Sequence, residues 1–299
     1  MIYIIPFFHQ TPFLRETLMS LRRQTDRNFS VVILDDSINP TETEKACAIT
    51  QEFQDLGARY LRNSRNLGLA GNWNQAIEVA VRERHDYLVI LHADDRLLPD
   101  YTIRIRQEWL RSPAAEAIFV KTRIIDENGR YRFSLPDFIK ECIRPRGKRI
   151  ELRGVSGVGK LIRGDFVFCP TICYRVACIK ERRFDQARKQ VLDFDWIVRS
   201  LLQGGLWIGL YDEPLFEYRR HSLNTTQQQS EDFSRYLEEI EFYRELSRVL
   251  DAHGEKILSR RASWMWIVRL NLGFEALKAL VRLRWARCSR CIRLMFSVA

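Results

Sequence analysis

The sequence contains no uninterrupted apolar run of the roughly 18 residues that a membrane-spanning helix requires, which argues against an integral membrane protein. Its apolar opening, residues 1–8, lacks the basic start and the small-residue cleavage site of a signal peptide. The seven cysteines are odd in number and irregularly spaced, a pattern typical of reduced thiols rather than of a disulfide framework. These absences together predict a cytoplasmic protein.

What the chain does have is the composition of a folded protein, with 46% hydrophobic and 29% charged residues over 299 positions. Its length suits one large α/β domain or two smaller ones. The net charge of +10 is uneven, because the part from Arg244 onward has 12 basic and 4 acidic residues. We therefore expect a nearly neutral body followed by a cationic tail that is attracted to an anionic surface.

Strand-like and helix-like segments alternate through the first 98 residues. Apolar strand patterns lie at 2–8, 29–34, 58–61 and 87–91, and helical patterns lie between them at 11–21, 41–56 and 71–84. Alternation of this kind predicts an α/β fold, in which a Rossmann-like, mostly parallel sheet is flanked by helices on both faces.

Two pairs of acids follow strands of this predicted sheet. Asp35 and Asp36 come directly after the second strand, and Asp94 and Asp95 come soon after the fourth. Either pair alone is also compatible with a solvated turn or a helix N-cap. Ligands of parallel sheets bind outside the carboxyl ends of the strands, where both pairs lie. Together they predict a site for a cation and a polar ligand.

The alternation weakens beyond residue 98. We expect a helix over 99–110, a strand over 117–125 and a hairpin turn at 128–129. Residues 134–160 are rich in proline, glycine and basic residues, which favours loops over the site. A helix over 191–202, a strand over 206–211 and an extended segment over 214–221 follow, and the chain after residue 230 is predicted to be helical.

Seven short motifs then follow one another in a recognisable order. They are Ile4-Ile5-Pro6; Leu18, Ser20, Leu21 and Gln24; Val32 to Ser37; Asn66-Leu67-Gly68 and Asn72; Leu91 to Asp95 and Pro99; Leu192 to Trp196 and Arg199; and Tyr218, Arg219 and His221. This ordered set resembles the inverting GT-A glycosyltransferases of glycosyltransferase family 2, over Ile2 to about Thr226. The resemblance implies a GT-A domain at 1–226, with a nucleotide-binding half at 1–98 and an acceptor-binding half at 99–226, before a helical extension at 227–299.

For the donor, the resemblance implies a nucleotide sugar, most simply a UDP-sugar. The residues expected to contact its nucleotide are Pro6, Asp35, Asp36, Arg65, Asn72, His92 and Asp94. Arg65 and Asn72 are alternatively ordinary polar groups of a loop and a helix start. His92 departs from the family pattern, because it stands where relatives have the first acid of the metal-binding motif. This replacement predicts an altered donor contact, or else a purely structural hydrogen-bond partner.

A divalent cation is expected at the second acidic pair. Mn²⁺ and Mg²⁺ accept carboxylate ligands, so Asp94 and Asp95 suit either ion, which would neutralise the diphosphate as it leaves. The resemblance implies that His221 reaches this metal or the diphosphate, and that Arg219 or Arg220 contacts the diphosphate. The alternative interpretation of these three residues is a basic surface loop.

Inversion requires a base that removes the proton of the acceptor hydroxyl. Asp193 aligns with the acid that relatives use for this step, and Asp195 follows two residues later. Residues two apart at a helix start do not share a face, so only one is expected to reach the acceptor, and we favour Asp193. Its alternative role is that of helix N-cap.

Two further motifs resemble sites and are interpreted otherwise. Residues 154–160 have the spacing of a phosphate-binding loop, but Leu161 follows where such loops have a serine or threonine, so a flexible loop is expected. Cys288 and Cys291 lack a second cysteine pair, which argues against a zinc site.

The basic tail carries apolar residues at helical spacing. They are Leu277, Val281, Trp285, Cys288, Ile292 and Met295, whereas five basic residues lie largely off this face: Lys278, Arg282, Arg287, Arg290 and Arg293. The pattern predicts one amphipathic helix on an anionic membrane surface. The alternative is a helix packed on the catalytic domain or on a partner.

The sequence therefore predicts an inverting glycosyltransferase on the inner face of the cell membrane. It would transfer a sugar to a lipid-linked or cell-surface glycan acceptor in envelope polysaccharide biosynthesis, such as that of lipopolysaccharide. A second hypothesis is a membrane scaffold that binds nucleotide sugars with little turnover. Nucleic-acid binding is not expected, because the tail interleaves tryptophan and leucine at helical spacing and no nucleic-acid motif is present.

Overall fold

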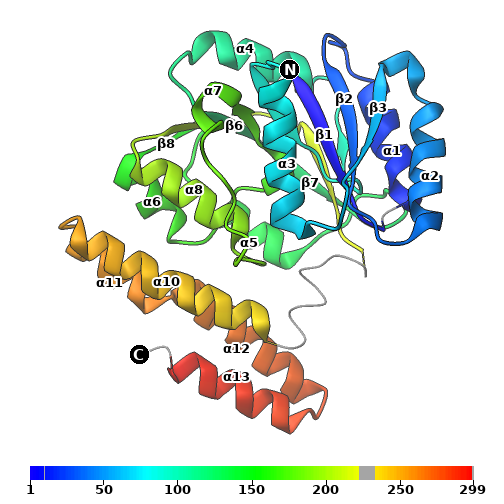
Figure 1. The fold of residues 1–299 in the computed structure, drawn as a ribbon. Coiled ribbons are helices and arrows are strands. Elements are labelled where there is room, and N and C mark those ends of the chain that lie inside the picture. Colours follow the sequence, from blue (N-terminus) through cyan, green and yellow to red (C-terminus); the bar gives the residue numbers. More distant parts are fainter. Residues whose placement is uncertain (10, 222–232, 298–299) are drawn as a thin grey trace.

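The computed structural model describes residues 1–9, 11–221 and 233–297. It consists of an α/β domain around a large central sheet, followed by helices that lie together along one side of that domain (Figure 1). The predicted α/β fold is confirmed. The predicted domain boundary between residues 226 and 227 lies outside the described residues.

The large sheet has the strand order β3-β2-β1-β4-β9-β6-β10-β8. In that order the strands are Ala58–Arg62, Ser30–Asp35, Ile2–Phe7, Tyr87–Ile90, Cys173–Arg175, Ala117–Val120, Leu206–Leu210 and Arg149–Arg153. Strands β3, β2, β1 and β4 pair in parallel, so their carboxyl ends meet at one sheet edge. β9 pairs antiparallel with β4 and β6, and β8 pairs antiparallel with β10.

A smaller sheet supports that carboxyl edge. Its order is β5-β11-β7, with β5 at Arg96–Leu97, β11 at Phe216–Arg219 and β7 at Thr122–Ile125. β5 begins directly after the loop that follows β4, and β11 pairs with it in the antiparallel sense. The small sheet therefore brings the chain near residue 219 next to the loop near residue 95.

Alternate residues of the central strands face opposite layers of helices. Ile2 and Ile4 of β1 pack toward α3 (Gly68–Arg82), α6 (Gly154–Leu161) and α8 (Leu192–Leu202). Tyr3, Ile5 and Phe7 pack toward α1 (Thr11–Arg22), α2 (Pro40–Gln51) and α4 (Tyr101–Arg111). This alternation explains why the strand sequences are apolar throughout, since both faces are covered.

The C-terminal helices continue one of these two cores. They are α10 (Ser234–Ala252), α11 (Lys256–Trp264), α12 (Trp266–Val281) and α13 (Trp285–Ser297). Their buried side chains, such as Phe242 and Leu272, belong to the same apolar cluster as α3, α6 and α8. None of the helices in the described part of the chain is both long and apolar enough to cross a bilayer.

The segment 117–125 was predicted as one strand, and the structure corrects this. It divides at Lys121 into β6 and β7, which belong to different sheets. The backbone of Lys121 donates to the carbonyl of Leu210 and accepts from the amide of Leu215, at 2.7 and 3.0 Å. These two long-range bonds turn the chain from one sheet into the other, and nothing in the local sequence marks them. The turn predicted at 128–129 is present, with Gly129 at φ +74°.

The prediction of loops over residues 134–160 is also wrong. This stretch forms α5 (Leu135–Ile143), β8 and α6. Three short elements lie elsewhere in the chain: η1 (Gln54–Leu56), η2 (Cys169–Thr171) and α7 (Val176–Ile179). Residues 154–160, which have phosphate-loop spacing, make up most of helix α6. A side chain at Gly157 would lie 3.1 Å from the backbone of Leu152, so glycine there serves close packing.

The prediction of a single amphipathic helix in the tail is also wrong. The chain leaves its helical path after Val281, where Leu283 has a φ of +55°, and α13 then packs against α12. Cys288 and Cys291 are buried in this contact, whereas Val281, Leu283 and Trp285 at the turn are 75%, 70% and 64% exposed. The tail is a helical hairpin with an apolar, exposed turn.

Candidate functional site

Hydrogen bonds from helix α1 and the residues that follow it hold the loop after β4 in place. The Thr17 hydroxyl donates to the carbonyls of Ala93 and Asp95, at 2.9 and 2.8 Å, and the Ser20 hydroxyl accepts from the amide of Leu97 at 3.1 Å. Gln24 donates to the carbonyl of Leu98 at 2.8 Å. The first-helix motif residues therefore act as a support for the acidic loop.

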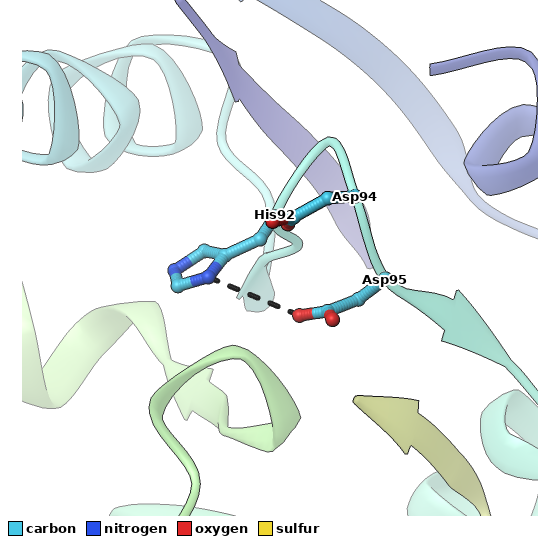
Figure 2. Close-up of side chains that lie close together, drawn as sticks. All are labelled: His92, Asp94 and Asp95. Carbon is cyan, nitrogen blue, oxygen red and sulfur yellow. Dashed lines mark ion pairs between the residues drawn. The ribbon is translucent and has the colours of Figure 1, made fainter. Parts of the chain in front are cut away.

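His92, Asp94 and Asp95 of this loop form a cluster of possible metal ligands. Each offers one ligand atom, and these atoms lie within 4.8 Å of one another (Figure 2). Nδ1 of His92 is 3.9 Å from Oδ2 of Asp95. Burial lowers the pKa of His92, which favours the neutral imidazole that metals bind. Burial and the neighbouring charge of Asp94 raise the pKa of Asp95 well above its usual range.

Two buried atoms of this cluster have no hydrogen-bond partner among the described residues. They are Nε2 of His92 and Oδ2 of Asp95. A buried polar atom without a partner is costly unless a ligand or ion satisfies it. An imidazole nitrogen and carboxylate oxygens are a donor set that divalent transition metals accept. The cluster therefore fits a divalent cation.

His221 joins the same cluster from the end of β11. Its Nε2 lies 2.8 Å from Oδ2 of Asp94, and its ring lies 4.7 Å from the ring of Phe13. Both His221 and Asp94 are almost fully buried. The family resemblance implied that His221 lies near the metal or the diphosphate, and the structure shows it in contact with Asp94.

Arg219 and Arg220, expected at the diphosphate, have different surroundings. The Arg219 guanidinium is fully buried and donates to the carbonyls of Asp94, Asp126 and Glu127, at 2.7, 3.2 and 3.0 Å. It also pairs with Glu16 at 2.5 Å, and the Arg219 amide donates to Oδ1 of Asp95 at 2.8 Å. Arg219 thus holds the acidic loop from behind rather than presenting its guanidinium to a ligand.

Arg220 is instead paired with a buried carboxylate of helix α5. Its Nη2 and Nε donate to the two oxygens of Asp137, at 2.7 and 3.2 Å. This pair lowers the pKa of Asp137, although burial acts in the opposite direction. The contact ties α5 to the chain that carries His221.

The acids after β2 are saturated with hydrogen bonds from the protein. Asp36 accepts from the side-chain amides of Asn63 and Asn66 and from the amides of Leu67 and Gly68, all between 2.7 and 3.1 Å. It thereby caps the start of α3, and a nucleotide has to displace a protein donor to reach its carboxylate.

Asp35 and Asn72 are likewise held inside the protein. Asp35 accepts from the amide of Ser37 at 2.8 Å and from the hydroxyl of Tyr60. Asn72 is buried and donates to the carbonyl of Leu34 at 3.3 Å. Both residues fix the shape of this sheet edge.

Arg65 is the predicted nucleotide contact that remains open to solvent. It lines an open polar depression together with Asp36, Ser37, Ile38 and Asn66. Pro6 is partly exposed on β1, in register with Leu34 of β2. The loop residues of this sheet edge therefore line the depression together with Asp36, whose carboxylate is also bound by protein amides.

The two acids of α8 point to different neighbours. Asp195 pairs with Arg199 one turn later, at 2.7 Å. Asp193 accepts from the amide of Phe194 at 2.9 Å, and burial raises its pKa although Lys140 opposes the shift. The helix begins at Leu192, so Asp193 lies in its first turn and is not the N-cap. An acid with a raised pKa is a stronger base once it is ionised.

Asp165 is a further acid that sequence reasoning missed. Burial and the charge of Asp193 raise its pKa to about 7, although Lys140 lowers it. The thiol of Cys169, whose pKa burial raises, is also influenced by the charges of Asp193, Asp165 and Asp95. No motif marks Asp165, because its nearness to Asp193 depends on how the chain packs between α6 and β9.

The chain was compared with families and with known proteins. The model described as "Glycosyl transferase family 2" matches residues 3–167. The "Uncharacterized glycosyltransferase MJ1057" of Methanocaldococcus jannaschii is 25% identical over 209 residues, which is 69% of this chain and 66% of that protein.

Solved structures share the fold at low identity. S. aureus TarS 1-349 in complex with UDP-GlcNAc aligns over 88% of this chain and 69% of its own, with 18% identity and a TM-score of 0.61. The mannosyltransferase PcManGT from Pyrobaculum calidifontis, in complex with GDP-Man and Mn²⁺, aligns over 99% of this chain and 85% of its own, with 14% identity and a TM-score of 0.61. A longer TarS chain is covered over only 42% of its length, so this chain spans less than half of it.

Proposed function

The chain belongs to glycosyl transferase family 2, and on that premise we propose that it transfers a sugar from a nucleotide-sugar donor to an acceptor hydroxyl with inversion. One observation carries the proposal. His92, Asp94 and Asp95 offer ligand atoms within 4.8 Å of one another, and Nε2 of His221 lies 2.8 Å from Oδ2 of Asp94. Such a cluster suits the divalent cation that would neutralise a departing diphosphate.

The donor is proposed to be a UDP-sugar that lies across the carboxyl edge of β1 and β2. Pro6, Arg65 and the saturated Asp35–Asp36 loop would border the base and ribose, with Asn72 shaping the loop from inside. The solved structures of the same fold contain UDP-GlcNAc and GDP-Man, which supports a nucleotide sugar as the donor class.

The cofactor is proposed to be Mn²⁺ or Mg²⁺, held by Asp94 and Asp95 with His92 or His221 as the nitrogen ligand. A mixed nitrogen and oxygen set favours Mn²⁺, because Mg²⁺ prefers oxygen alone. When bound, the cation would neutralise charge on the diphosphate leaving group. Arg220 lies beside this site, but its pairing with Asp137 has to loosen before it contacts phosphate.

Asp193 is proposed as the base. Its carboxylate is partly buried and keeps one oxygen outside the bond from Phe194. Its raised pKa makes it a stronger proton acceptor than an ordinary aspartate, and such assistance contributes about 10²–10⁴ in rate. Asp195, engaged by Arg199, is left with a structural role.

The acceptor is proposed to be a lipid-linked or cell-surface glycan of envelope polysaccharide biosynthesis, bound by the half of the domain at 99–226. An exposed apolar strip supports this proposal. Tyr131, Phe133, Leu135 and Phe138 are all exposed, and the rings of Phe133 and Phe138 lie 5.8 Å apart. Asp137, next to Phe138, links this strip to Arg220 and so to the cation site. Apolar patches of this kind mark binding surfaces.

The extension at 227–299 is proposed to hold the enzyme on the anionic inner face of the cell membrane. The turn between α12 and α13 exposes Val281, Leu283 and Trp285 beside Arg282 and Arg284. Apolar side chains flanked by cations suit a bilayer with anionic headgroups, and each cation near that surface contributes about 1 kcal/mol.

The proposal is tested by thermal unfolding with UDP, GDP, UDP-GlcNAc and GDP-mannose, each with and without Mn²⁺. A ligand that binds the native state at about 100 times its Kd stabilises it by about 2.7 kcal/mol, which raises the Tm by several degrees. We expect at least one nucleotide to produce such a shift only with Mn²⁺. If none of the four shifts the Tm with metal present, the donor proposal is wrong.

A second candidate is a membrane scaffold that binds nucleotide sugars with little turnover. It is favoured by one observation, the presence of His92 where relatives have an acid. Release of nucleotide distinguishes the two, since a scaffold binds the donor saturably and releases no UDP or GDP during long incubation. Steady release that depends on Mn²⁺ identifies the enzyme.

A further inference from the structure

Helix α10 of the C-terminal extension contacts the segment that leads into α8. Oε1 of Glu238 accepts hydrogen bonds from three consecutive backbone amides, those of Lys189, Gln190 and Val191, at 2.9, 2.9 and 3.1 Å. Val191 is the N-cap position of α8, and its own side chain makes no capping bond. These amides precede the first turn of α8, so a carboxylate 47 residues further along the chain fixes the segment that enters the helix.

The chemistry of this contact is that of an anion bound by a backbone nest. Successive amides that converge on one oxygen make a concave site for negative charge, and the start of a helix adds its positive dipole. Hydrogen bonds from neutral amides to a carboxylate are also stronger than those to a neutral acceptor. One oxygen of Glu238 therefore fixes the direction in which the chain enters α8.

Two other contacts fasten the same segment to α10. Arg188 forms an ion pair with Glu245. On the other side of the contact, the ring of Phe194 lies 4.9 and 5.9 Å from the rings of Phe242 and Tyr243. The residues on both sides of Asp193 are thus held by one helix.

We propose that Glu238 is a positioning residue for Asp193, so that the C-terminal extension is part of the catalytic apparatus and not only an anchor. The inference rests on the proposed role of Asp193 as base. Removing the acceptor oxygen frees three amides and lets the first turn of α8 shift. A displacement of the base by about 1 Å is enough to reduce the rate about 10²-fold.

The test compares Glu238→Ala with Glu238→Gln in the full-length protein. Glutamine keeps an oxygen at the same position and loses only the charge, so it separates acceptor geometry from electrostatics. Glu241→Ala, on the exposed side of α10, is the matched control. Turnover is measured as Mn²⁺-dependent release of UDP from UDP-GlcNAc or of GDP from GDP-mannose, whichever donor the protein binds.

We expect Glu238→Ala to lower kcat about 10- to 100-fold while the KM for the donor and its Kd change less than about twofold. Glu238→Gln is expected to restore most of kcat, and Glu241→Ala to match the unmodified protein. An unchanged kcat in Glu238→Ala overturns the inference, as does a loss confined to donor affinity. Equal damage by alanine and glutamine overturns the positioning mechanism.

Two further measurements separate this inference from the proposed function. If Asp193→Asn turns over normally, the base assignment fails, whatever Glu238 does. Hydrogen exchange reports the contact without any activity: Glu238→Ala should speed exchange of amides 189–191, and leave that of α2 unchanged. Unaltered exchange at 189–191 shows that the three amides do not depend on Glu238.

Discussion

Nε2 of His221 lies 2.8 Å from Oδ2 of Asp94, although the two residues are 127 positions apart in the chain. The bond joins the end of β11 in the small sheet to the loop after β4 in the large sheet. It sets the orientation of a carboxylate that belongs to the cluster of possible metal ligands. The small sheet is therefore what completes the site.

Asp94→Asn should abolish the effect of Mn²⁺ on nucleotide binding. The substitution removes the charge that holds a cation while keeping the shape that His221 contacts. In calorimetric titration with Mn²⁺ present, the variant should bind UDP or GDP at least about tenfold more weakly than the unmodified protein does. Without Mn²⁺, the two proteins should bind the nucleotide with the same affinity. Asp100→Asn, on the exposed start of α4, is the control. Equal metal dependence in both variants counts against the cluster.

Asp193→Asn should remove turnover and leave donor binding intact. Asparagine can still accept the bond from Phe194 but cannot take a proton, so a loss of about 10²–10⁴ in kcat is expected. Asp195→Asn should retain most activity, since its partner is Arg199 on the same helix. Initial rates at saturating donor decide between them. Greater damage in the Asp195 variant reverses the assignment.

The contribution of Asp165 to the stability of the protein should fall as the pH rises from about 4 to about 7. Burial and Asp193 raise the pKa of Asp165 from 3.8 to about 7, so the folded state binds a proton that the unfolded state has already lost. This contribution is fully present below pH 4 and is lost through pH 7.

Asp165→Asn should remove that loss and stabilise the protein at pH 8 by an amount on the order of 2 kcal/mol. The measurement is urea unfolding at pH 5 and pH 8, with Glu241→Gln as the control. A pH dependence that is identical in the Asp165 variant shows that this carboxyl is not the group responsible.

Arg219→Met should destabilise the fold rather than act only on catalysis. The guanidinium is fully buried and binds three carbonyls and Glu16, so its removal leaves buried polar groups without partners. Breaking a buried charged network costs about 3–5 kcal/mol, whereas loss of the exposed pair of Arg15 and Glu52 should change the stability little. Thermal unfolding of Arg219→Met and Arg15→Met compares the two. Similar Tm values for the two variants would mean that the hydrogen bonds of Arg219 contribute little to the stability of the fold.

Replacing Leu283 and Trp285 by serine should weaken binding to anionic vesicles. Both side chains are exposed at the turn between α12 and α13, so the fold should survive. Sedimentation with vesicles of phosphatidylglycerol and phosphatidylcholine is expected to fall severalfold, and binding of the unmodified protein should weaken with salt. Leu110→Ser, an exposed leucine on α4, is the control. No binding by the unmodified protein removes the membrane proposal.

The fold class and the acidic edge followed from local patterns in the sequence. Apolar strands with helices between them, and acids directly after the second and soon after the fourth strand, depend only on neighbouring residues. Parallel pairing then brings those acids to one edge, because the carboxyl ends of the strands lie on the same side. The expectation that His221 lies near Asp94 and Asp95 came instead from the family resemblance.

The roles of individual side chains were decided by contacts between distant segments. Arg219 resembles a phosphate ligand in sequence, but the hairpin at 126–130 and helix α1 enclose its guanidinium. Asp36 appears open at a strand end, but the loop before α3 covers it. The split at Lys121 and the hairpin of α12 and α13 likewise depend on packing that no local pattern encodes.

The sequence by itself therefore determined where the strands end and which charges stand there, because hydrophobic periodicity is a local property. The tertiary structure decided which of those charges remain available for chemistry. A carboxylate or guanidinium that is already hydrogen-bonded within the protein is less available to a ligand. The hydrogen-bond partners of Asp36, Arg219 and Glu238 all come from distant parts of the chain.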